Sequence, residues 1–293
     1  MTRGTHTDAA GRDKTMIFAL NGATTGPADL QTDVAAASAA GYAGVELRDT
    51  KVEAYLQRGT STADLRELCR RAGVSVASVN ALEDSTLSTG PANDAVMERC
   101  SRFCAWARAL ACPVVVAVPS VGGPDRTDVA GQTADALRRM GAIARAHGVR
   151  IGFEFLGFPA CSVRTVHEAW EIVDQVADPA VGLVIDAFHF FTGGSTWDML
   201  DCLDPSRLFI VHLDDAEDRP AAELADRHRV LPGDGVFPLR EFVRRIRATG
   251  YDGVYSLELF RPEYWDWDPF DLAKTGLKKM EALFDRNVVS SCR

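Results

Sequence analysis

The chain has 293 residues, 46% of them hydrophobic, a length that suits either two domains or one large α/β barrel. Its 32 basic and 41 acidic residues give a net charge of −9, which argues against a surface for nucleic-acid phosphates or anionic lipid. No apolar run reaches the roughly 18 residues of a membrane-spanning helix.

The first 15 residues, Met1 to Thr15, are polar and lack the apolar segment of a secretory signal. We expect residues 1–15 to form a disordered tail and residues 16–293 to form a single catalytic domain. Within that domain, short apolar strands alternate with amphipathic helices. The expected strands are 16–20, 44–48, 74–79, 113–118, 150–154, 181–186, 208–212 and 253–258. The expected helices are 29–40, 62–72, 93–111, 127–147, 164–176, 196–203, 238–249 and 269–284.

Eight strands that alternate with eight helices predict one closed (β/α)8 TIM barrel. The strands are unbroken runs rich in Val and Ile, which is typical of a parallel sheet buried on both faces. A doubly wound sheet needs fewer strands and usually has a glycine-rich first turn. Neither GxGxxG nor GxxxxGK[ST] follows the first strand, so a cradle for nucleotide phosphates is not expected.

The last four expected strands each end in a potential metal ligand: Glu154, Asp186, His212 and Glu258. In a TIM barrel the carboxyl ends of the strands meet at one mouth, so these four side chains should come together there. Three carboxylates and one imidazole suit a divalent ion such as Mn, Zn, Co or Mg. The alternative is that the acids at the mouth form salt bridges with loop arginines. Because all four residues lie at matching ends of consecutive strands, we favour a metal site over this alternative.

Three further residues are candidates for contact with substrate. His189 follows Asp186 by three positions and is expected in the loop after that strand, facing either substrate or solvent. Asp214 lies on the same side of its strand as His212 and could touch substrate or support a ligand. Arg229, near the turn Pro232-Gly-Asp-Gly235 in the long loop 215–235, could reach substrate oxygens.

The seven cysteines contain no CxxC pair, which fits reduced thiols in a cytoplasmic protein. Cys100 and Cys104, spaced i, i+4 on an expected helix, are interpreted as buried structural thiols. The aromatic segment Trp265-Asp-Trp267 is either packed against the barrel or part of an interface, in which case the protein would be a homo-oligomer.

With these residues the chain resembles the xylose-isomerase-like barrels, over nearly everything from Met16 to Phe284. This superfamily includes sugar isomerases and epimerases, inosose and dehydroshikimate dehydratases and the endonuclease IV group. Within it, the resemblance is greatest to the inosose isomerases of bacterial inositol catabolism. The segments that carry the resemblance are Asn21-x-Ala-Thr-Thr25, Val118-Pro119, Glu154-Phe-x-Gly157, Val181-Gly-Leu-Val-x-Asp186-x-Phe-His189, His212-x-Asp-Asp215-x-Glu-Asp218, Arg229-Val-x-Pro-Gly233 and Ser256-x-Glu-Leu-Phe-Arg-Pro-Glu-Tyr264.

The resemblance implies that Glu154, Asp186, His212 and Glu258 bind the metal and that Glu154 and Glu258 also form the acid–base pair. It further implies a keto-cyclitol substrate, 2-keto-myo-inositol, whose carbonyl moves one position through an enediolate to give 1-keto-D-chiro-inositol. One departure from the family pattern is Gly22, where a larger polar residue is expected, and it leaves the substrate open.

Other activities remain open at this stage. The same enediolate could expel a hydroxyl, which would make the protein an inosose dehydratase, or could be reprotonated in a free-ketose 3-epimerase. Phosphoester cleavage of the endonuclease type needs further metal ligands and a basic face, which the net charge of −9 disfavours. A barrel that binds a polyol for sensing, without catalysis, is the non-enzymatic reading.

Overall fold

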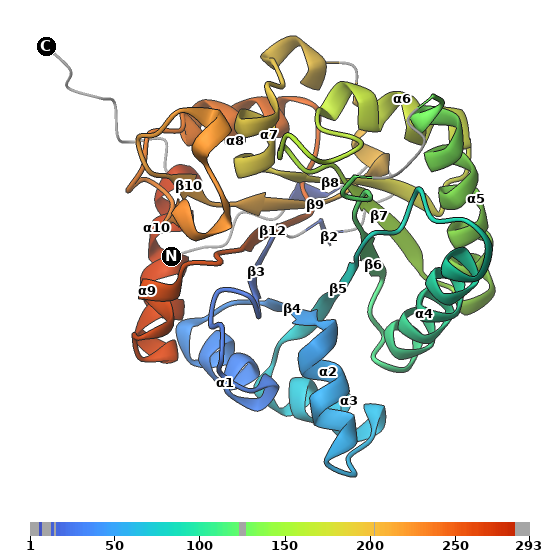
Figure 1. Ribbon diagram of the computed structural model, residues 1–293. Coiled ribbons are helices and arrows are strands. Elements are labelled where there is room, and N and C mark those ends of the chain that lie inside the picture. Colours follow the sequence, from blue (N-terminus) through green and yellow to red (C-terminus); the bar gives the residue numbers. More distant parts are fainter. Residues whose placement is uncertain (1–5, 8–12, 15, 123–126, 202, 285–293) are drawn as a thin grey trace, which may run out of the picture.

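The computed structural model describes residues 6–7, 13–14, 16–122, 127–201 and 203–284 of the chain. Its centre is a closed barrel of eight parallel strands in the order β12-β3-β4-β5-β6-β7-β8-β9, surrounded by helices (Figure 1). Consecutive barrel strands are neighbours all the way round, and the last one, β12, closes the barrel against the first, β3. The predicted (β/α)8 barrel is therefore confirmed.

All eight expected strands form. They are β3 (Ile17–Asn21), β4 (Gly44–Arg48), β5 (Ser75–Leu82), β6 (Val114–Ala117), β7 (Arg150–Glu154), β8 (Val181–Asp186), β9 (Leu208–Leu213) and β12 (Val254–Leu257). Every residue of β6, β8 and β9 is buried, as expected for strands that are covered by helices on one face and fill the barrel with the other.

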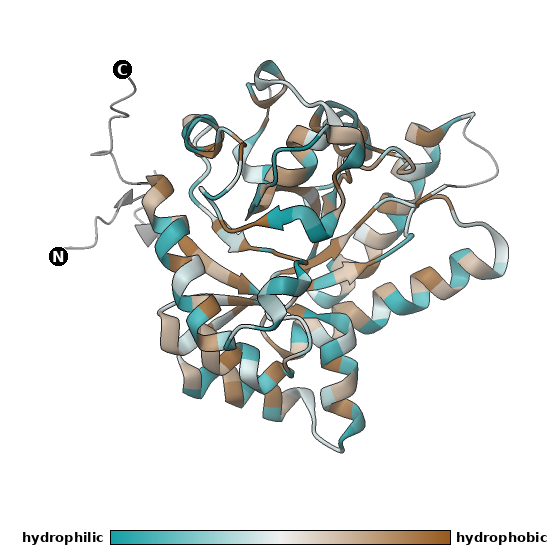
Figure 2. Ribbon diagram, turned by 60° about the vertical axis from the view of Figure 1, so that its left-hand side comes forward, coloured by the Kyte–Doolittle hydropathy of each residue, from teal (hydrophilic) through white to brown (hydrophobic). Residues whose placement is uncertain are grey.

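Ten α-helices are present in the described part of the chain. They are α1 (Leu30–Ala40), α2 (Asp49–Gln57), α3 (Thr62–Ala72), α4 (Gly90–Ala109), α5 (Val129–His147), α6 (Val166–Val176), α7 (Ala187–Gly193), α8 (Leu239–Ala248), α9 (Pro262–Trp265) and α10 (Pro269–Phe284). The strands appear mostly hydrophobic in Figure 2, whereas the outer helices alternate between hydrophobic and hydrophilic residues, as amphipathic helices do. None of the described helices has the length and apolarity of a transmembrane segment.

Helix ends follow the local signals in the sequence. Helix α1 begins where the side chain of Asp29 accepts a hydrogen bond from the amide of Thr32, and it ends at Gly41, which adopts a φ of 101°. Helix α3 begins with a reciprocal capping box between Ser61 and Asp64. These caps explain why the predicted bounds of α1 and α3 agree with the structure to within one residue.

The segment after β8 differs from the prediction. The expected helix 196–203 is only a 3-10 turn, η1 (Trp197–Leu200), while α7 begins directly at the end of β8. The cause is Asp186, whose carboxylate accepts the amide hydrogen of His189 at 3.1 Å and so caps α7. The prediction of His189 in a loop is therefore wrong: it lies in the first turn of this helix.

The expected loop 215–235 contains secondary structure of its own. Strands β10 (Asp215–Ala216) and β11 (Arg229–Val230) pair antiparallel. Two 3-10 turns lie between them, η3 (Ala221–Glu223) and η4 (Asp226–His228), and a third, η2 (Pro205–Arg207), precedes β9. The carboxylate of Asp215 accepts the amide hydrogens of Gly233 and Phe237 at 3.0 and 2.9 Å. This pairing folds the segment back and carries Arg229 to the mouth of the barrel.

The remaining predictions about packing have mixed outcomes. Cys100 and Cys104 are buried on α4, as predicted. The indole of Trp265 donates to the carbonyl of Ala23 at 3.2 Å, so this ring packs against the barrel. The prediction of disorder for residues 1–15 falls mostly outside the described residues; within them, β1 (His6–Thr7) pairs with β2 (Asp13–Lys14).

Gly182, the second residue of β8, provides a test of the barrel packing. A Cβ atom at this position would collide with the carbonyl oxygen of Arg207, which cannot move without displacing the backbone. We expect Gly182→Ala to lower the free energy of unfolding by about 1–3 kcal/mol in urea denaturation. Gly44→Ala is the control, because its Cβ would lie 3.2 and 3.3 Å from side-chain carbons and no closer than 3.6 Å to the nearest backbone atom, the carbonyl oxygen of Ser75. Equal stability of the two variants would contradict this packing.

Candidate metal centre

Four side chains at the mouth of the barrel form one buried cluster. Glu154 ends β7, Asp186 ends β8, His212 lies in β9, and Glu258 follows β12 directly. One potential ligand atom from each lies within 4.8 Å of all the others, and every one of the four residues is at most 3% exposed. The prediction that these residues converge is confirmed; their role as metal ligands stays a prediction.

The two nitrogens of His212 face different partners. Nδ1 lies 3.0 Å from Glu154, 3.2 Å from Glu258 and 3.7 Å from Asp186. Nε2 points the other way and lies 3.1 Å from a carboxylate oxygen of Glu46, in the middle of β4. Nδ1 is thus the nitrogen that could share a metal ion with the three carboxylates.

Glu258 is fixed by two amides that the sequence did not single out. Nδ2 of Asn21 donates to its Oε1 at 2.9 Å, and Nδ2 of Asn80 donates to the same oxygen at 3.3 Å. Arg48 in turn donates to Oδ1 of Asn80 at 2.7 Å, which determines the orientation of that amide. The other oxygen, Oε2, is left to face His212.

Arg229 is completely buried beside the cluster. Its Nη1 lies 2.6 Å from Asp186 and also binds Asp214, while Nη2 lies 2.9 Å from Asp226. The guanidinium packs over the ring of Phe188 at 4.6 Å. Burial raises the pKa of Asp186, but the nearby positive charge of Arg229 outweighs this effect and keeps the pKa of Asp186 below its usual range.

The contacts of His189 determine its tautomer. Nη2 of Arg229 lies 3.1 Å from Nε2 of His189, and a guanidinium can only donate, so Nε2 must accept. Burial, together with the charge of Arg229, lowers the pKa of His189 to about 4, and the ring is therefore neutral at neutral pH. Its proton lies on Nδ1, a buried donor without a hydrogen-bond partner among the described residues.

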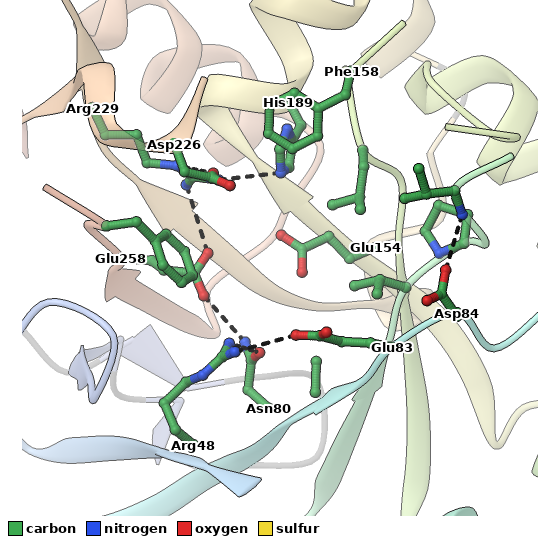
Figure 3. Close-up of a pocket in the computed structure, with 16 residues that line it drawn as sticks. Arg48, Asn80, Glu83, Asp84, Glu154, Phe158, His189, Asp226, Arg229 and Glu258 are labelled. Atoms are coloured by element: carbon green, nitrogen blue, oxygen red, sulfur yellow. Dashed lines mark hydrogen bonds and ion pairs between the residues drawn. The ribbon is translucent and has the colours of Figure 1, made fainter. Parts of the chain in front are cut away.

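A cavity of about 240 Å³ opens above the cluster. Glu154, Glu258, His189 and Arg229 line it, and Figure 3 shows their side chains directed toward the same space. Apolar and aromatic side chains form another part of the wall: Ala81, Val118, Pro119, Val121, Leu156, Phe158 and Phe260. His189 and Arg229 thus line the cavity, as their predicted contacts with substrate require, and the contacts themselves stay predictions.

Asp214 does not line this cavity. It is fully buried, one of its oxygens accepts the amide hydrogen of Phe188 at 2.9 Å, and the other binds Arg229. These contacts do not support the predicted binding of substrate by Asp214. They favour the alternative reading, in which Asp214 supports the site by holding Arg229.

Gly22 does not line the cavity either. A Cβ at this position would lie 2.8 Å from Asp33 and 3.4 Å from the side chain of Arg48. Arg48 does line the cavity. A larger residue at position 22 would therefore affect the cavity only through Arg48.

The donor set of the cluster fits one divalent cation. Three carboxylates and an imidazole nitrogen are the usual ligands of Zn, Mn or Co in proteins. Their crowding in a buried space is costly without a cation, since like charges at these distances repel. Arg229 lies 2.6 Å from Asp186 but 3.6 Å from Glu258, so it neutralises the negative charge of the cluster only in part.

In the metal-free protein, burial and the neighbouring charges should leave protons on two of the predicted ligands, His212 and Glu154. Burial lowers the pKa of His212, but the charges of Glu258, Glu46 and Glu154 raise it on balance well above its usual value. Burial raises the pKa of Glu154 to about 7, an effect that His212 opposes and Glu258 reinforces.

We therefore expect binding of Zn²⁺ at pH 7 to release at least one proton, because a metal ligand must give up its proton first. The apparent affinity should rise about tenfold per pH unit for each proton released. Calorimetric titrations in buffers of different ionisation enthalpy measure the number of protons. Binding without proton release would contradict the protonation described here.

Comparisons with known proteins agree with this geometry. The profile of the family described as "Xylose isomerase-like TIM barrel" matches residues 34–283. An inosose isomerase of Bacillus velezensis is 33% identical over 275 residues, which cover 92% of this chain and 98% of that protein. An inosose isomerase of Halalkalibacterium halodurans is 40% identical over 172 residues, covering 58% of this chain and 61%, less than two thirds, of that protein.

A solved structure described as the IOLI protein with a binding zinc atom has the same fold. It superimposes with a TM-score of 0.88 at 32% sequence identity, over 92% of this chain and 98% of that one. The bound zinc of that protein and the buried cluster here agree in indicating a site for one metal ion.

Proposed function

The chain belongs to the xylose isomerase-like TIM barrel family, and we propose that it is a metal-dependent inosose isomerase. The reaction would move the carbonyl of 2-keto-myo-inositol to the neighbouring carbon, giving 1-keto-D-chiro-inositol. The observation that carries this proposal is the position of two glutamates, Glu154 and Glu258, in a metal-ligand cluster at the floor of a small cavity.

The charges around the cavity favour a neutral polyol over an anionic substrate. Two arginines line it, against five carboxylates: Glu83, Asp84, Glu154, Asp226 and Glu258. Both arginines have acidic partners, since Arg48 lies 3.4 Å from Glu83 and Arg229 binds Asp186. No cation in the described lining is therefore left to pair with a substrate carboxylate or phosphate, as a dehydroshikimate or a sugar phosphate would require.

A bound divalent ion would supply Lewis-acid polarisation of the substrate carbonyl and of the adjacent hydroxyl. Glu154, Asp186, His212 and Glu258 would hold that ion. One of the two glutamates removes the proton from the hydroxyl-bearing carbon, which produces an enediolate, and a proton is then returned to the former carbonyl carbon. With the hydroxyl proton passing from one oxygen to its neighbour, the carbonyl has moved by one position and no atom is gained or lost.

The remaining lining residues orient the substrate. His189 would donate its Nδ1 hydrogen to a substrate oxygen, since this buried donor has no partner among the described residues and Nε2 is occupied by Arg229. Phe158 and Phe260 provide apolar surface for the carbon-bound hydrogens of a ring. Asn21 and Asn80 keep Glu258 in place while its free oxygen exchanges a proton.

Proton NMR of the zinc-loaded protein with 2-keto-myo-inositol in D2O tests this function. New keto-inositol resonances with deuterium at carbon, lost after EDTA treatment, are the expected result. A product that lacks one hydroxyl would make the protein a dehydratase, and a product inverted at one carbon an epimerase. Binding without any exchange would replace the enzymatic proposal with a polyol-binding protein.

Two further aspects of this proposal concern location and assembly. Cys69, Cys100, Cys104 and Cys112 are buried and form no disulfide, which supports the predicted cytoplasmic location. Trp267 and Phe270 are each 43% exposed, which supports the second of the two alternatives for this segment, an interface in a homo-oligomer. Light scattering after gel filtration would measure the oligomeric state, and a monomer would contradict that prediction.

A further inference from the structure

Glu46 is a buried carboxylate to which neither the sequence nor the proposed mechanism assigns a role. It is the third residue of β4, its side chain is fully buried, and it does not line the cavity. Strand β4 is separated from β9 by β3 and β12 in the barrel, so Glu46 reaches His212 across the interior. A residue in this position contacts a predicted metal ligand but cannot contact substrate.

All described partners of this carboxylate are hydrogen-bond donors. Oγ of Ser78 donates to Oε2 at 2.6 Å, and Nδ2 of Asn21 donates to Oε1 at 3.2 Å. Both partners come from neighbouring strands at matching positions, because Glu46 pairs in register with Asn21 on β3 and with Ser78 on β5. The two neighbouring strands therefore hold the carboxylate in place, and its oxygens can also accept a hydrogen bond from His212 across the barrel interior.

Contact with His212 fixes the role of each ring nitrogen. Nε2 lies 3.1 Å from Oε1 of Glu46 and 3.3 Å from Oε2, so it must carry the hydrogen of this bond. A histidine that binds a metal is neutral and has one hydrogen only, so with this hydrogen on Nε2 the lone pair lies on Nδ1. That is the nitrogen 3.0 Å from Glu154 and 3.2 Å from Glu258.

We propose that Glu46 is a positioning residue of the metal centre, which holds Nε2–H of His212 and thereby directs the Nδ1 lone pair at the metal ion. This inference rests on the proposed function, because it assumes that the cluster binds a metal. A carboxylate that accepts the remote N–H of a metal-bound histidine fixes its tautomer and raises its basicity, and loss of such a partner typically weakens metal binding about 10–100-fold.

Titration of the metal-free full-length protein with Co²⁺, followed by its d–d absorption, tests this role without any substrate. Glu46→Gln keeps an oxygen that can accept Nε2–H but removes the negative charge. We expect this variant to bind Co²⁺ about 10–100-fold more weakly, with a shifted d–d band. Affinity within twofold of the unmodified protein, with an unchanged band, would overturn the proposal.

Asp33→Asn is the matched control for the loss of a buried carboxylate. Asp33 is also buried and paired, with Lys51 at 2.8 Å, but it lies outside the metal cluster. Its variant should bind Co²⁺ as the unmodified protein does, and an equal loss in both variants would show that Glu46 acts only through general stability.

Ser78→Ala covers the case in which Glu46→Gln does not fold. This change leaves Glu46 intact and removes only the hydrogen bond to its Oε2. We expect a several-fold loss of Co²⁺ affinity, and unchanged affinity would again overturn the proposal. If the unmodified protein itself did not bind Co²⁺, the proposed metal-dependent function would fail as well, so the two failures are distinguishable.

Discussion

Glu258→Gln is expected to lower kcat/KM for 2-keto-myo-inositol by about 10²–10⁴-fold or more, with little change in stability. The glutamine is isosteric, and its oxygen can still accept from Asn21 and Asn80. Its amide nitrogen would then face His212, where it can neither bind a cation nor take up a proton. The range of 10²–10⁴ is the usual contribution of proton transfer by a positioned side chain, and the loss of a metal ligand would add to it.

The matched control is Glu263→Gln, the same substitution five positions later. Glu263 is a surface residue whose side chain is 68% exposed and pairs with Arg261 at 3.3 Å. Its variant should retain full activity. Turnover of Glu258→Gln near the rate of the unmodified protein would refute the assignment of Glu258 as an acid–base residue and metal ligand.

Arg229→Met should have the largest effect on stability. The methionine keeps part of the apolar stem but removes the cation shared by Asp186, Asp214 and Asp226. Two of these acids, Asp186 and Asp214, are fully buried. Removal of one partner from a buried ion pair costs about 3–5 kcal/mol, so we expect a loss of that size in urea denaturation of the metal-free protein.

Arg219→Met serves as the surface control, since Arg219 is 45% exposed and its pair with Glu217 should contribute at most about 1 kcal/mol. Addition of Zn²⁺ should restore part of the stability of Arg229→Met, because the ion then compensates Asp186 while Asp214 stays unpaired. A loss below about 1 kcal/mol without metal would contradict the central role of Arg229 in this network.

The fold and the ligand cluster could be predicted from the sequence because both depend on patterns along single strands. Each of the last four strands is an apolar run that ends in, or just before, a polar residue, and the parallel arrangement brings those ends together. Gly41 and Gly73, each directly after a helix, also made the ends of α1 and α3 predictable. The pattern failed for α7, because one residue, Asp186, both ends a strand and caps a helix.

The residues that support the cluster could not be predicted in the same way. Glu46 lies in the middle of Gly44–Arg48, and its acidic side chain within a buried strand was the available signal. That signal indicates a partner for Glu46 but does not identify it, since His212 is 166 positions away. Asn21 and Asn80 likewise act on Glu258, which is 237 and 178 positions away, and only the closed barrel determines that they meet.

The closure of β12 against β3 has a consequence for biosynthesis. Asn21 and Glu258 are 237 positions apart in the chain, yet they share a hydrogen bond in the metal centre. Every residue up to Glu258 must therefore leave the ribosome before this part of the centre can assemble, and a nascent chain that stops before β12 lacks one of the four ligands. Acquisition of the metal by all four ligands would accordingly be a late event that follows closure of the barrel.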